Sequence, residues 1–260
     1  MKQKLPFLMF LLLLFGMAGS NAQQVIAHRG FWKTEGSAQN SIASLMKADS
    51  IGVYGSEVDV WLSSDGIPIV NHDADVTLEG RKLKVQETPF ATLQKVTLSN
   101  GESLPSFDEY LNAFAGCKTT RLIIELKPHS SKEREDALVA KVMEMVQQKT
   151  LEERVEYISF SLNLVRQVRM TDARVPVYYL NGDLTPQVLD TLQFNGADYH
   201  FNVIKNHPEW VEMAHKLGQK INVWTVNQPE DIQKMIELKV DFITTDEPVS
   251  VMKAVACFNK

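Results

Sequence analysis

The sequence is poor in cysteine and contains no apolar run long enough to cross a membrane. Two of its 260 residues are cysteine, Cys117 and Cys257, and neither belongs to a C-x-x-C redox motif. An oxidising compartment would allow them to form a disulfide. We expect separate thiols instead, because cysteine is common in protein cores as a small hydrophobic residue.

The chain also lacks an excess of basic residues and any segment that resembles an interdomain linker. Its formal net charge is −5, which excludes the strongly basic proteins that bind nucleic acids. An anionic substrate would therefore need local cations or a metal. A hydrophobic fraction of 44% over this length suits one domain with a single core. The sequence predicts no oligomeric state.

The N-terminus has the pattern of a secretory signal peptide. Lys2 and Lys4 precede an apolar run over 5–17, and small residues follow up to Ala22. We predict cleavage after Ala22, which leaves 23–260 as the mature domain, exported to the periplasm or secreted. The apolar run is shorter than the ~20 residues that a spanning helix needs, so we expect no stable membrane anchor.

Beyond this segment, short apolar runs alternate with amphipathic ones, which is typical of parallel strands joined by helices. Eight such units in one domain predict a (β/α)₈ TIM barrel. The expected strands are 25–28, 57–60, 122–125, 156–159, 176–179, 197–200, 221–224 and 241–244. The expected helices are 40–51, 106–115, 132–149, 164–170, 186–194, 208–217, 229–237 and 248–257.

One segment interrupts this rhythm after the second strand and predicts a distorted barrel. An Asp-Gly pair at Asp65 is a hairpin turn signal, and folding the chain about it places Asn71 opposite Asp59. We therefore interpret 67–71 as an extra strand. The residues 73–104 would form a small insertion over the barrel mouth, with a secondary structure that the sequence leaves open.

A cluster of acidic residues is predicted at the carboxyl ends of the strands, where TIM barrels carry their chemistry. Glu57 and Asp59 are two residues apart on one strand and point the same way, and Glu125 lies on the neighbouring strand. Buried together, these carboxylates would repel one another unless a cation binds them. Oxygen ligands without cysteine or histidine favour Ca²⁺ or Mg²⁺. The alternative is a salt-bridge network with Lys127 and Arg29.

Two histidines are expected beside this acidic cluster. His28 ends the first strand, and the hairpin returns His72 to the same neighbourhood. Single histidines on strands are usually structural, but two that converge on carboxylates suit a proton acceptor and a proton donor. Arg29 and Lys127 suit phosphate oxygens.

Other aromatic and imidazole side chains carry a weaker signal. Trp224 either packs in the core or forms a wall of the pocket, and His200 either packs at the rim or contacts substrate. His129, His207 and His215 are expected to be solvated.

The polar motifs, in their order and spacing, resemble those of the glycerophosphodiester phosphodiesterase family over nearly all of the mature length. The matching motifs are Ile26-Ala27-His28-Arg29-Gly30, Glu57-Val58-Asp59-Val60, Asp65-Gly66-Ile67-Pro68, His72-Asp73, Glu125-Leu126-Lys127, Trp224-Thr225-Val226-Asn227 and Thr244-Thr245-Asp246-Glu247-Pro248.

The resemblance implies a phosphoric diester hydrolase on a distorted TIM barrel. Its small-molecule substrate would be a glycerophosphodiester, cut into an alcohol and glycerol 3-phosphate with a divalent metal. The resemblance implies Glu57, Asp59 and Glu125 as metal ligands. It also implies His28 and His72 as the acid–base pair, with Arg29 and Lys127 bound to the phosphate.

The chain departs from the family at one motif. The usual Pro-Glu-Asn is replaced by Ala38-Gln39-Asn40, so Gln39 keeps the length of glutamate but loses its charge. This difference bears on metal affinity and even more on the preferred head group. We expect Asn40 to cap or orient the first helix near the site.

Two other functions remain open from the sequence. A lyase or phospholipase-like relative would form a cyclic phosphate or cut an intact lipid on the same barrel. A relative that only binds phosphodiesters is suggested by Gln39 alone.

Overall fold

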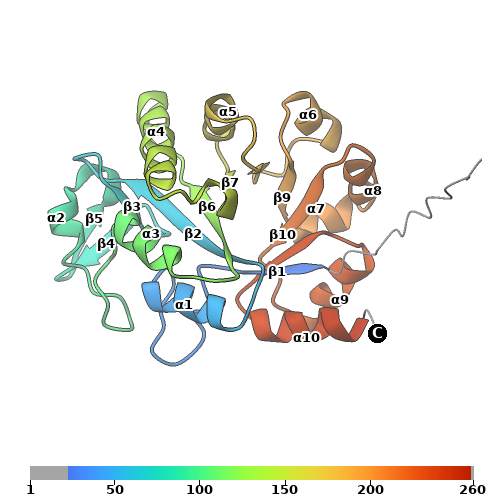
Figure 1. The fold of residues 1–260 in the computed structure, drawn as a ribbon, viewed down its shortest axis with the longest axis horizontal. Coiled ribbons are helices and arrows are strands. Elements are labelled where there is room, and N and C mark those ends of the chain that lie inside the picture. The colour runs from blue at the N-terminus through green and yellow to red at the C-terminus, as the bar shows by residue number, and fades with distance from the viewer. Residues whose placement is uncertain (1–22, 259–260) are drawn as a thin grey trace, which may run out of the picture.

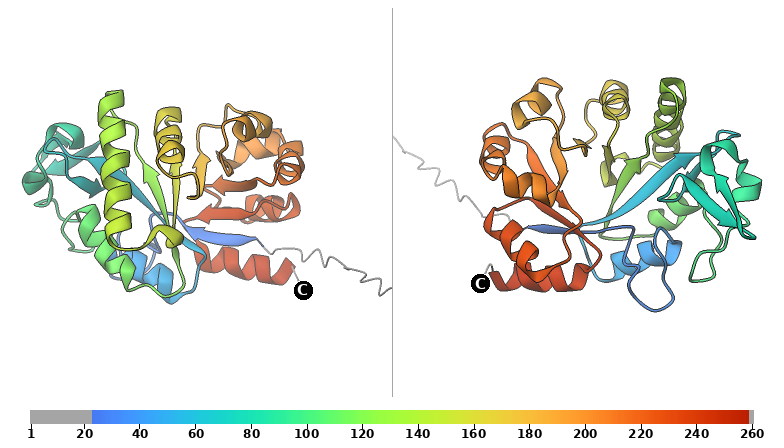
Figure 2. Two further views of the ribbon diagram at one scale, coloured as in Figure 1. Left: turned by 45° about the horizontal axis from the view of Figure 1, so that its top comes forward. Right: turned by 180° about the vertical axis from the view of Figure 1, so that it is seen from behind.

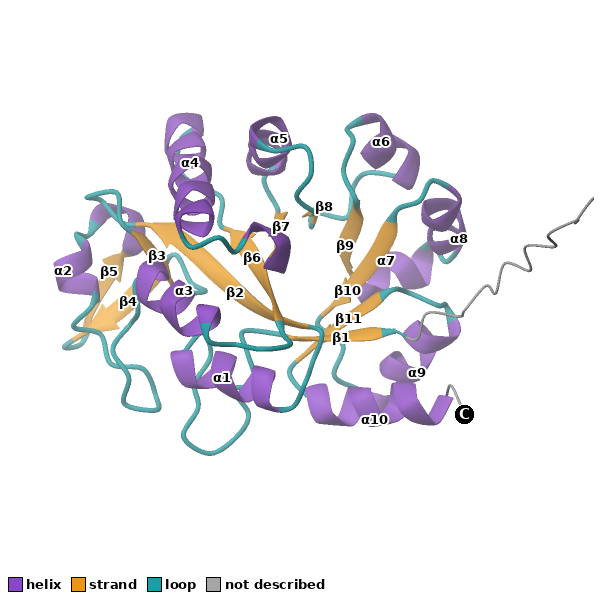
Figure 3. Cartoon of the chain, in the orientation of Figure 1, coloured by secondary structure: helices purple, strands orange, loops and turns teal. Residues whose placement is uncertain are grey.

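The computed structural model describes residues 23–258, so the predicted signal peptide lies outside the described residues. Within that range, eight parallel strands close into a barrel, because β1 pairs with both β2 and β11 (Figures 1 and 3). In barrel order they are β1 (Gln24–Ala27), β2 (Gly55–Leu62), β6 (Arg121–Leu126), β7 (Val155–Ser159), β8 (Val177–Tyr179), β9 (Gly196–His200), β10 (Lys220–Trp224) and β11 (Phe242–Thr245). The predicted TIM barrel is confirmed.

Helices lie outside the barrel in each view (Figure 2). The helices at the eight predicted positions are α1 (Ile42–Ser50), α3 (Phe107–Ala115), α4 (Lys132–Gln148), α5 (Leu162–Thr171), α6 (Pro186–Thr191), α8 (Glu209–Lys216), α9 (Pro229–Glu237) and α10 (Pro248–Phe258). Local sequence sets several starts: Ser106 and Glu109 form a capping box, and Ser131 and Ser161 cap α4 and α5. None of the described helices combines the length and hydropathy that a membrane span requires.

The predicted hairpin after β2 is present. Strand β3 (Pro68–Val70) runs antiparallel to β2, and the Asn71 N–H donates to the Asp59 carbonyl at 3.1 Å, as the turn at Asp65 predicts. The stretch that follows contains the short elements β4 (Asp75–Leu78), β5 (Arg81–Lys84), η1 (Val85–Glu87) and α2 (Phe90–Leu93).

The insertion lies beyond the end of β2, at the side of the barrel (Figure 1). It shares an apolar cluster with the hairpin, in which Trp61 and Ile69 pack with Val76, Val85 and Leu93. This cluster anchors the insertion to the outer end of β2. The expected position over the barrel mouth is therefore wrong, and no residue of 73–104 lines the central cavity described below.

The barrel interior changes character along its axis. An apolar group that includes Ile26, Ile123, Ile158, Tyr178 and Phe242 fills it. Towards the carboxyl ends of the strands the inward positions become polar and charged, which is the end where TIM barrels carry their sites.

Candidate active site

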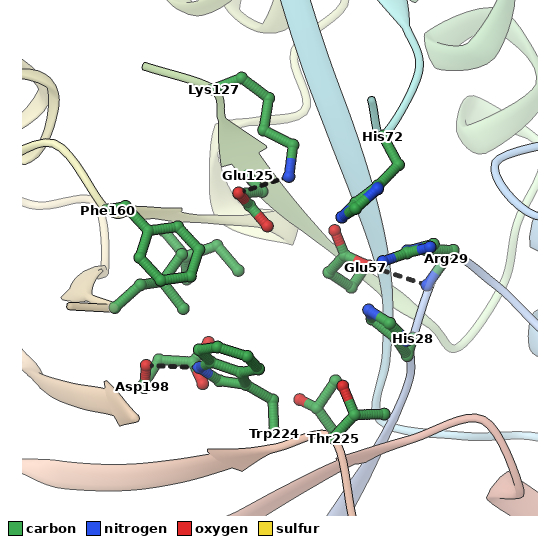
Figure 4. A pocket seen from close by; sticks show the side chains of 13 residues that line it. His28, Arg29, Glu57, His72, Glu125, Lys127, Phe160, Asp198, Trp224 and Thr225 are labelled. Atoms are coloured by element: carbon green, nitrogen blue, oxygen red, sulfur yellow. Dashed lines mark hydrogen bonds and ion pairs between the residues drawn. The ribbon is translucent and has the colours of Figure 1, made fainter. Parts of the chain in front are cut away.

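A cavity of about 500 Å³, including its open mouth, lies at the carboxyl end of the barrel. One side is charged and is lined by His28, Arg29, Glu57, His72, Glu125 and Lys127 (Figure 4). The opposite side is apolar and is formed by Ile158, Phe160, Leu180 and Trp224. The cavity thus combines groups that can bind an anion with a wall suited to carbon atoms.

The three predicted carboxylates meet at the charged side. Asp59 on β2 pairs in register with Glu125 on β6, and Glu57 precedes Asp59 by two residues on the same face. Each residue offers one carboxylate oxygen, and these three oxygens lie within 4.8 Å of one another. All three residues are buried. The strand register alone therefore produces a compact acidic cluster.

Lys127 neutralises part of this cluster. Its ammonium group lies 2.7 Å from both Asp59 Oδ1 and Glu125 Oε1. Burial would lower the pKa of Lys127, but the two carboxylates outweigh it and raise the pKa. The Lys127 side chain is thus a fixed cation.

The acidic cluster retains an oxygen that the protein does not satisfy. Glu57 Oε1 is buried without a hydrogen-bond partner among the described residues, while Glu57 Oε2 accepts the Arg29 backbone N–H at 2.8 Å. Such a group is costly unless a ligand completes it. Three buried carboxylates with one open oxygen form a donor set that fits a hard divalent cation.

The electrostatics show the same deficit of positive charge. Burial, with the repulsion of Asp59 and Glu125, raises the pKa of Glu57 well above its ordinary value. Burial and Asp59 raise the pKa of Glu125 to about 7. Burial also acts on Asp59, but Lys127, His72 and the hydrogen bond from Asn40 together outweigh it, and the pKa of Asp59 is lowered. The surrounding groups thus favour the ionised form of Asp59 and leave Glu57 and Glu125 under-compensated.

Arg29 reaches the cluster from a turn that needs glycine. The chain passes through positive φ at Arg29 and Gly30, and a Cβ at Gly30 would lie 2.3 Å from Ser44 Oγ. The guanidinium Nε lies 3.7 Å from Asp59 Oδ2, and Nη1 donates to Gln39 Oε1 at 2.7 Å. The uncharged Gln39 therefore holds Arg29 without adding a negative charge to the one that Asp59 supplies.

Asn40 differs from its predicted role. Its side chain donates to Asp59 Oδ2 at 2.7 Å, and its Oδ1 accepts the Asp59 N–H at 3.2 Å. The cap of α1 is Ser41, whose hydroxyl accepts the Ser44 N–H at 3.0 Å. Asn40 thus orients a carboxylate of the acidic cluster and does not cap the helix.

His28 is held by an acid from the last strand–helix loop. Its Nδ1 lies 2.8 Å from Asp246 Oδ1, which also accepts from Trp32 Nε1, while Asn227 Nδ2 donates to Asp246 Oδ2 at 2.8 Å. Burial alone would raise the pKa of Asp246, but these hydrogen bonds outweigh it and lower the pKa to about 2. Asp246 thus remains ionised, fixes the imidazole of His28 and leaves Nε2 available to the cavity.

This contact gives a measurable pH dependence of stability. The depressed pKa stabilises the folded state above the unfolded value of 3.8, and the stabilisation is lost as the pH falls towards 2. We expect Asp246→Asn to lower the free energy of unfolding by about 2 kcal/mol at pH 7, and by about 1 kcal/mol at pH 3. Urea melts of both proteins at the two pH values measure this difference. An equal difference at both would contradict it.

His72 faces the cavity from the end of the hairpin. Its Nδ1 lies 2.7 Å from Asp73 Oδ1, which leaves Nε2 free. Burial lowers the pKa of His72, against the attraction of Asp59. The structure thus brings both predicted histidines to one cavity, and the Nδ1 of each contacts a carboxylate.

The weaker aromatic candidates have distinct positions. Trp224 lines the cavity, with Phe160 edge-on at 5.5 Å between ring centroids. His200 packs against Trp224 and caps the short helix α7 (Phe201–Asn206), which the sequence did not predict. His129 is half-buried, and its two ring nitrogens form hydrogen bonds with the Lys127 carbonyl and the Leu62 N–H. The expectation that His129 is solvated was therefore wrong.

The remaining histidines and both cysteines lie away from the cavity. His207 and His215 are exposed, as expected. Cys117 is buried, Cys257 is exposed, and both are free thiols.

A comparison with known families agrees with this geometry. The model of the "Glycerophosphoryl diester phosphodiesterase family" matches residues 28–250, which include every charged residue of the cavity. The chain belongs to this family.

Individual members of the glycerophosphoryl diester phosphodiesterase family are similar over almost the whole chain. The glycerophosphodiester phosphodiesterase of Caldanaerobacter subterraneus subsp. tengcongensis is 30% identical over 89% of this chain and 97% of its own. A glycerophosphodiester phosphodiesterase from Parabacteroides distasonis has a crystal structure with a TM-score of 0.89 and 42% identity, covering 93% of this chain and 100% of that one.

A more distant protein shares the fold. A phosphodiesterase from Oleispira antarctica, solved in complex with the product sn-glycerol-3-phosphate, has a TM-score of 0.78 and 24% identity, covering 90% of this chain and 97% of that one.

Several side chains at the site received no role from the sequence. Asp246 and Asn227 lie in motifs that mark strand ends, so their positions carried a signal. The contact of Asp246 with His28, and that of Asn227 with Asp246, did not. Phe160 and Asp198 lie outside those motifs and line the cavity only because β7 and β9 turn them inward.

Proposed function

We propose that this protein hydrolyses glycerophosphodiesters to an alcohol and glycerol 3-phosphate, using a divalent cation and two histidines. One observation carries the proposal. A buried acidic cluster and two histidines, each hydrogen-bonded to a carboxylate, meet at the same cavity. Membership of the family supports the same reaction, and glycerol 3-phosphate is the product found in the Oleispira antarctica protein.

Glu57, Asp59 and Glu125 would hold the cation, and the unpartnered Glu57 Oε1 supports this assignment. When bound, a divalent cation supplies Lewis-acid polarisation of the phosphate. Oxygen donors alone favour Ca²⁺ or Mg²⁺. Asn40 keeps Asp59 in position for that role, because it fixes both the carboxylate and the backbone of the same residue.

Arg29 and Lys127 would stabilise the phosphoryl oxygens. The guanidinium Nε of Arg29 has no hydrogen-bond partner among the described residues, and Gln39 holds the group without neutralising it. Lys127 contributes a buried positive charge beside the acidic cluster. Fixed cations of this kind lower the cost of charge that develops during phosphoryl transfer.

His28 and His72 would move the protons. With Nδ1 held by Asp246, His28 can accept a proton at Nε2 from the attacking water or from the substrate's adjacent hydroxyl. In the second case a water molecule must then open the cyclic phosphate that forms, to give glycerol 3-phosphate. His72 would protonate the departing alkoxide, and its lowered pKa makes its protonated form a stronger acid. Trp224 would form the wall against which the carbon atoms of the substrate pack.

The proposal is tested with glycerophosphocholine, glycerophosphoethanolamine, glycerophosphoinositol and glycerophosphoglycerol, each with EDTA, Ca²⁺, Mg²⁺ or Mn²⁺. We expect glycerol 3-phosphate to appear with at least one head group, only when a divalent ion is present. Phosphorus NMR identifies the product directly. A stable cyclic phosphate would instead indicate a lyase, and binding without turnover under every ion would indicate a binding protein.

A further inference from the structure

The cavity contains a second buried acid that the proposed reaction does not use. Asp198 on β9 lines the cavity beside Trp224, two residues before the end of its strand (Figure 4). The residue is 2% exposed, and it lies on the apolar side, across from the acidic cluster.

The surrounding groups leave one oxygen of Asp198 without a partner. Asp198 Oδ1 is buried and makes no hydrogen bond to any described residue. The Trp224 indole N–H donates to the Asp198 backbone carbonyl at 2.9 Å, and Asn222 on the adjacent strand exchanges hydrogen bonds with Thr244. The Trp224 indole therefore does not serve the carboxyl group, and the side-chain hydrogen bond from Asn222 still leaves Oδ1 without a donor. A buried polar atom in this condition needs a ligand or water to satisfy it.

Asp198 is suited to an uncharged ligand group. Burial raises the pKa of Asp198 well above its ordinary value, against the opposing effect of Asn222. A protonated carboxyl offers one donor and one acceptor, which matches a hydroxyl group. The neighbouring wall of Phe160 and Trp224 suits the carbon atoms to which such a hydroxyl is attached.

We propose that Asp198 binds the terminal hydroxyl of the substrate's glycerol unit and so selects glycerol esters among phosphodiesters. This inference rests on the proposed function, because the phosphate must lie at the charged side for the glycerol unit to extend towards Asp198. A hydroxyl that completes a buried hydrogen bond gives strong selectivity, since an analogue without it leaves the protein group unpaired.

The test compares glycerophosphocholine with 2-hydroxypropyl phosphocholine, which lacks only the terminal hydroxyl. We expect the wild-type protein to prefer the glycerol compound by at least about tenfold in kcat/KM. In Asp198→Leu the preference is expected to fall to within about twofold of equality, mainly through loss on the glycerol compound. In Asp198→Asn, which keeps the shape of the side chain, we expect the preference to fall at least about threefold.

Glu156→Gln is the matched control. Glu156 is also a buried acid inside the barrel, but Arg121 and Tyr54 satisfy it and it does not line the cavity. This variant should keep the wild-type preference. A preference that is absent in the wild type, or unchanged in the folded Asp198 variants, would overturn the inference alone. Failure of the wild type to hydrolyse any of the four glycerophosphodiesters named above would instead refute the proposed function. If it hydrolyses only one with another head group, the same pair of compounds is made with that head group.

Discussion

Turnover of a glycerophosphodiester is expected to fall at least about a hundredfold when either His28 or His72 is replaced by alanine, because each change removes one proton-transfer group. The two imidazoles face one cavity, and each is fixed at Nδ1 by a carboxylate, Asp246 or Asp73. Initial rates at saturating substrate and metal measure the effect. Since neither histidine belongs to the acidic cluster, the concentration of metal that gives half-maximal activity should change little.

His215→Ala is the control for these variants. His215 is exposed at the end of α8 and pairs with Asp241, away from the cavity. Its replacement should leave turnover within about twofold of the wild type, because a surface ion pair contributes little. Near-normal turnover in His28→Ala or His72→Ala would reject the assignment of that histidine as an acid or base. Equal losses in all three variants would mean that the loss does not come from the site.

The barrel could be predicted because its signals are local. Each strand is a short apolar run, and the residues that follow several of them begin a helix with a serine cap or an N-terminal proline. The insertion was harder, because its position depends on Trp61 and Ile69 packing against residues far along the chain. The six-residue helix α7 is too short for a periodic signal, and it begins where the His200 side chain accepts the Asn202 N–H.

The site could be predicted only to the level of residue type and strand face. The spacing of Glu57 and Asp59 placed them together, and the turn at Asp65 placed His72 nearby. The contact of Asn40 with Asp59 could not be predicted from spacing. It depends on a turn in which the backbone of Asn40 has a positive φ, and the sequence does not show this conformation. His129 likewise follows a proline just after a strand. Its hydrogen bond from the Leu62 N–H on β2 is a long-range contact that no local sequence pattern predicts.

Removal of divalent metal is expected to abolish turnover, and Glu57→Gln is expected to raise the metal concentration needed to restore it. Glu57 is the acid whose Oε1 lacks a partner, so it has the most to gain from a cation. Glutamine keeps the length of the side chain and an oxygen that can accept the Arg29 N–H, but it loses the negative charge that a hard cation prefers. We expect the half-maximal metal concentration to rise at least about tenfold, as is typical when the environment of a metal is altered.

The measurement is a titration of EDTA-treated protein with Ca²⁺ or Mg²⁺, followed by initial rates. Glu135→Gln is a matched control, because Glu135, at the start of α4, is also buried but is satisfied by Ser161 and Asn163 at the start of α5. Its metal dependence should equal that of the wild type. Full turnover in EDTA would contradict the metal proposal, and would mean that Lys127, which already bridges Asp59 and Glu125, provides all the positive charge that the acidic cluster requires. A normal titration of Glu57→Gln would instead place the cation on Asp59 and Glu125 without Glu57, and would leave the open Glu57 oxygen to a substrate hydroxyl.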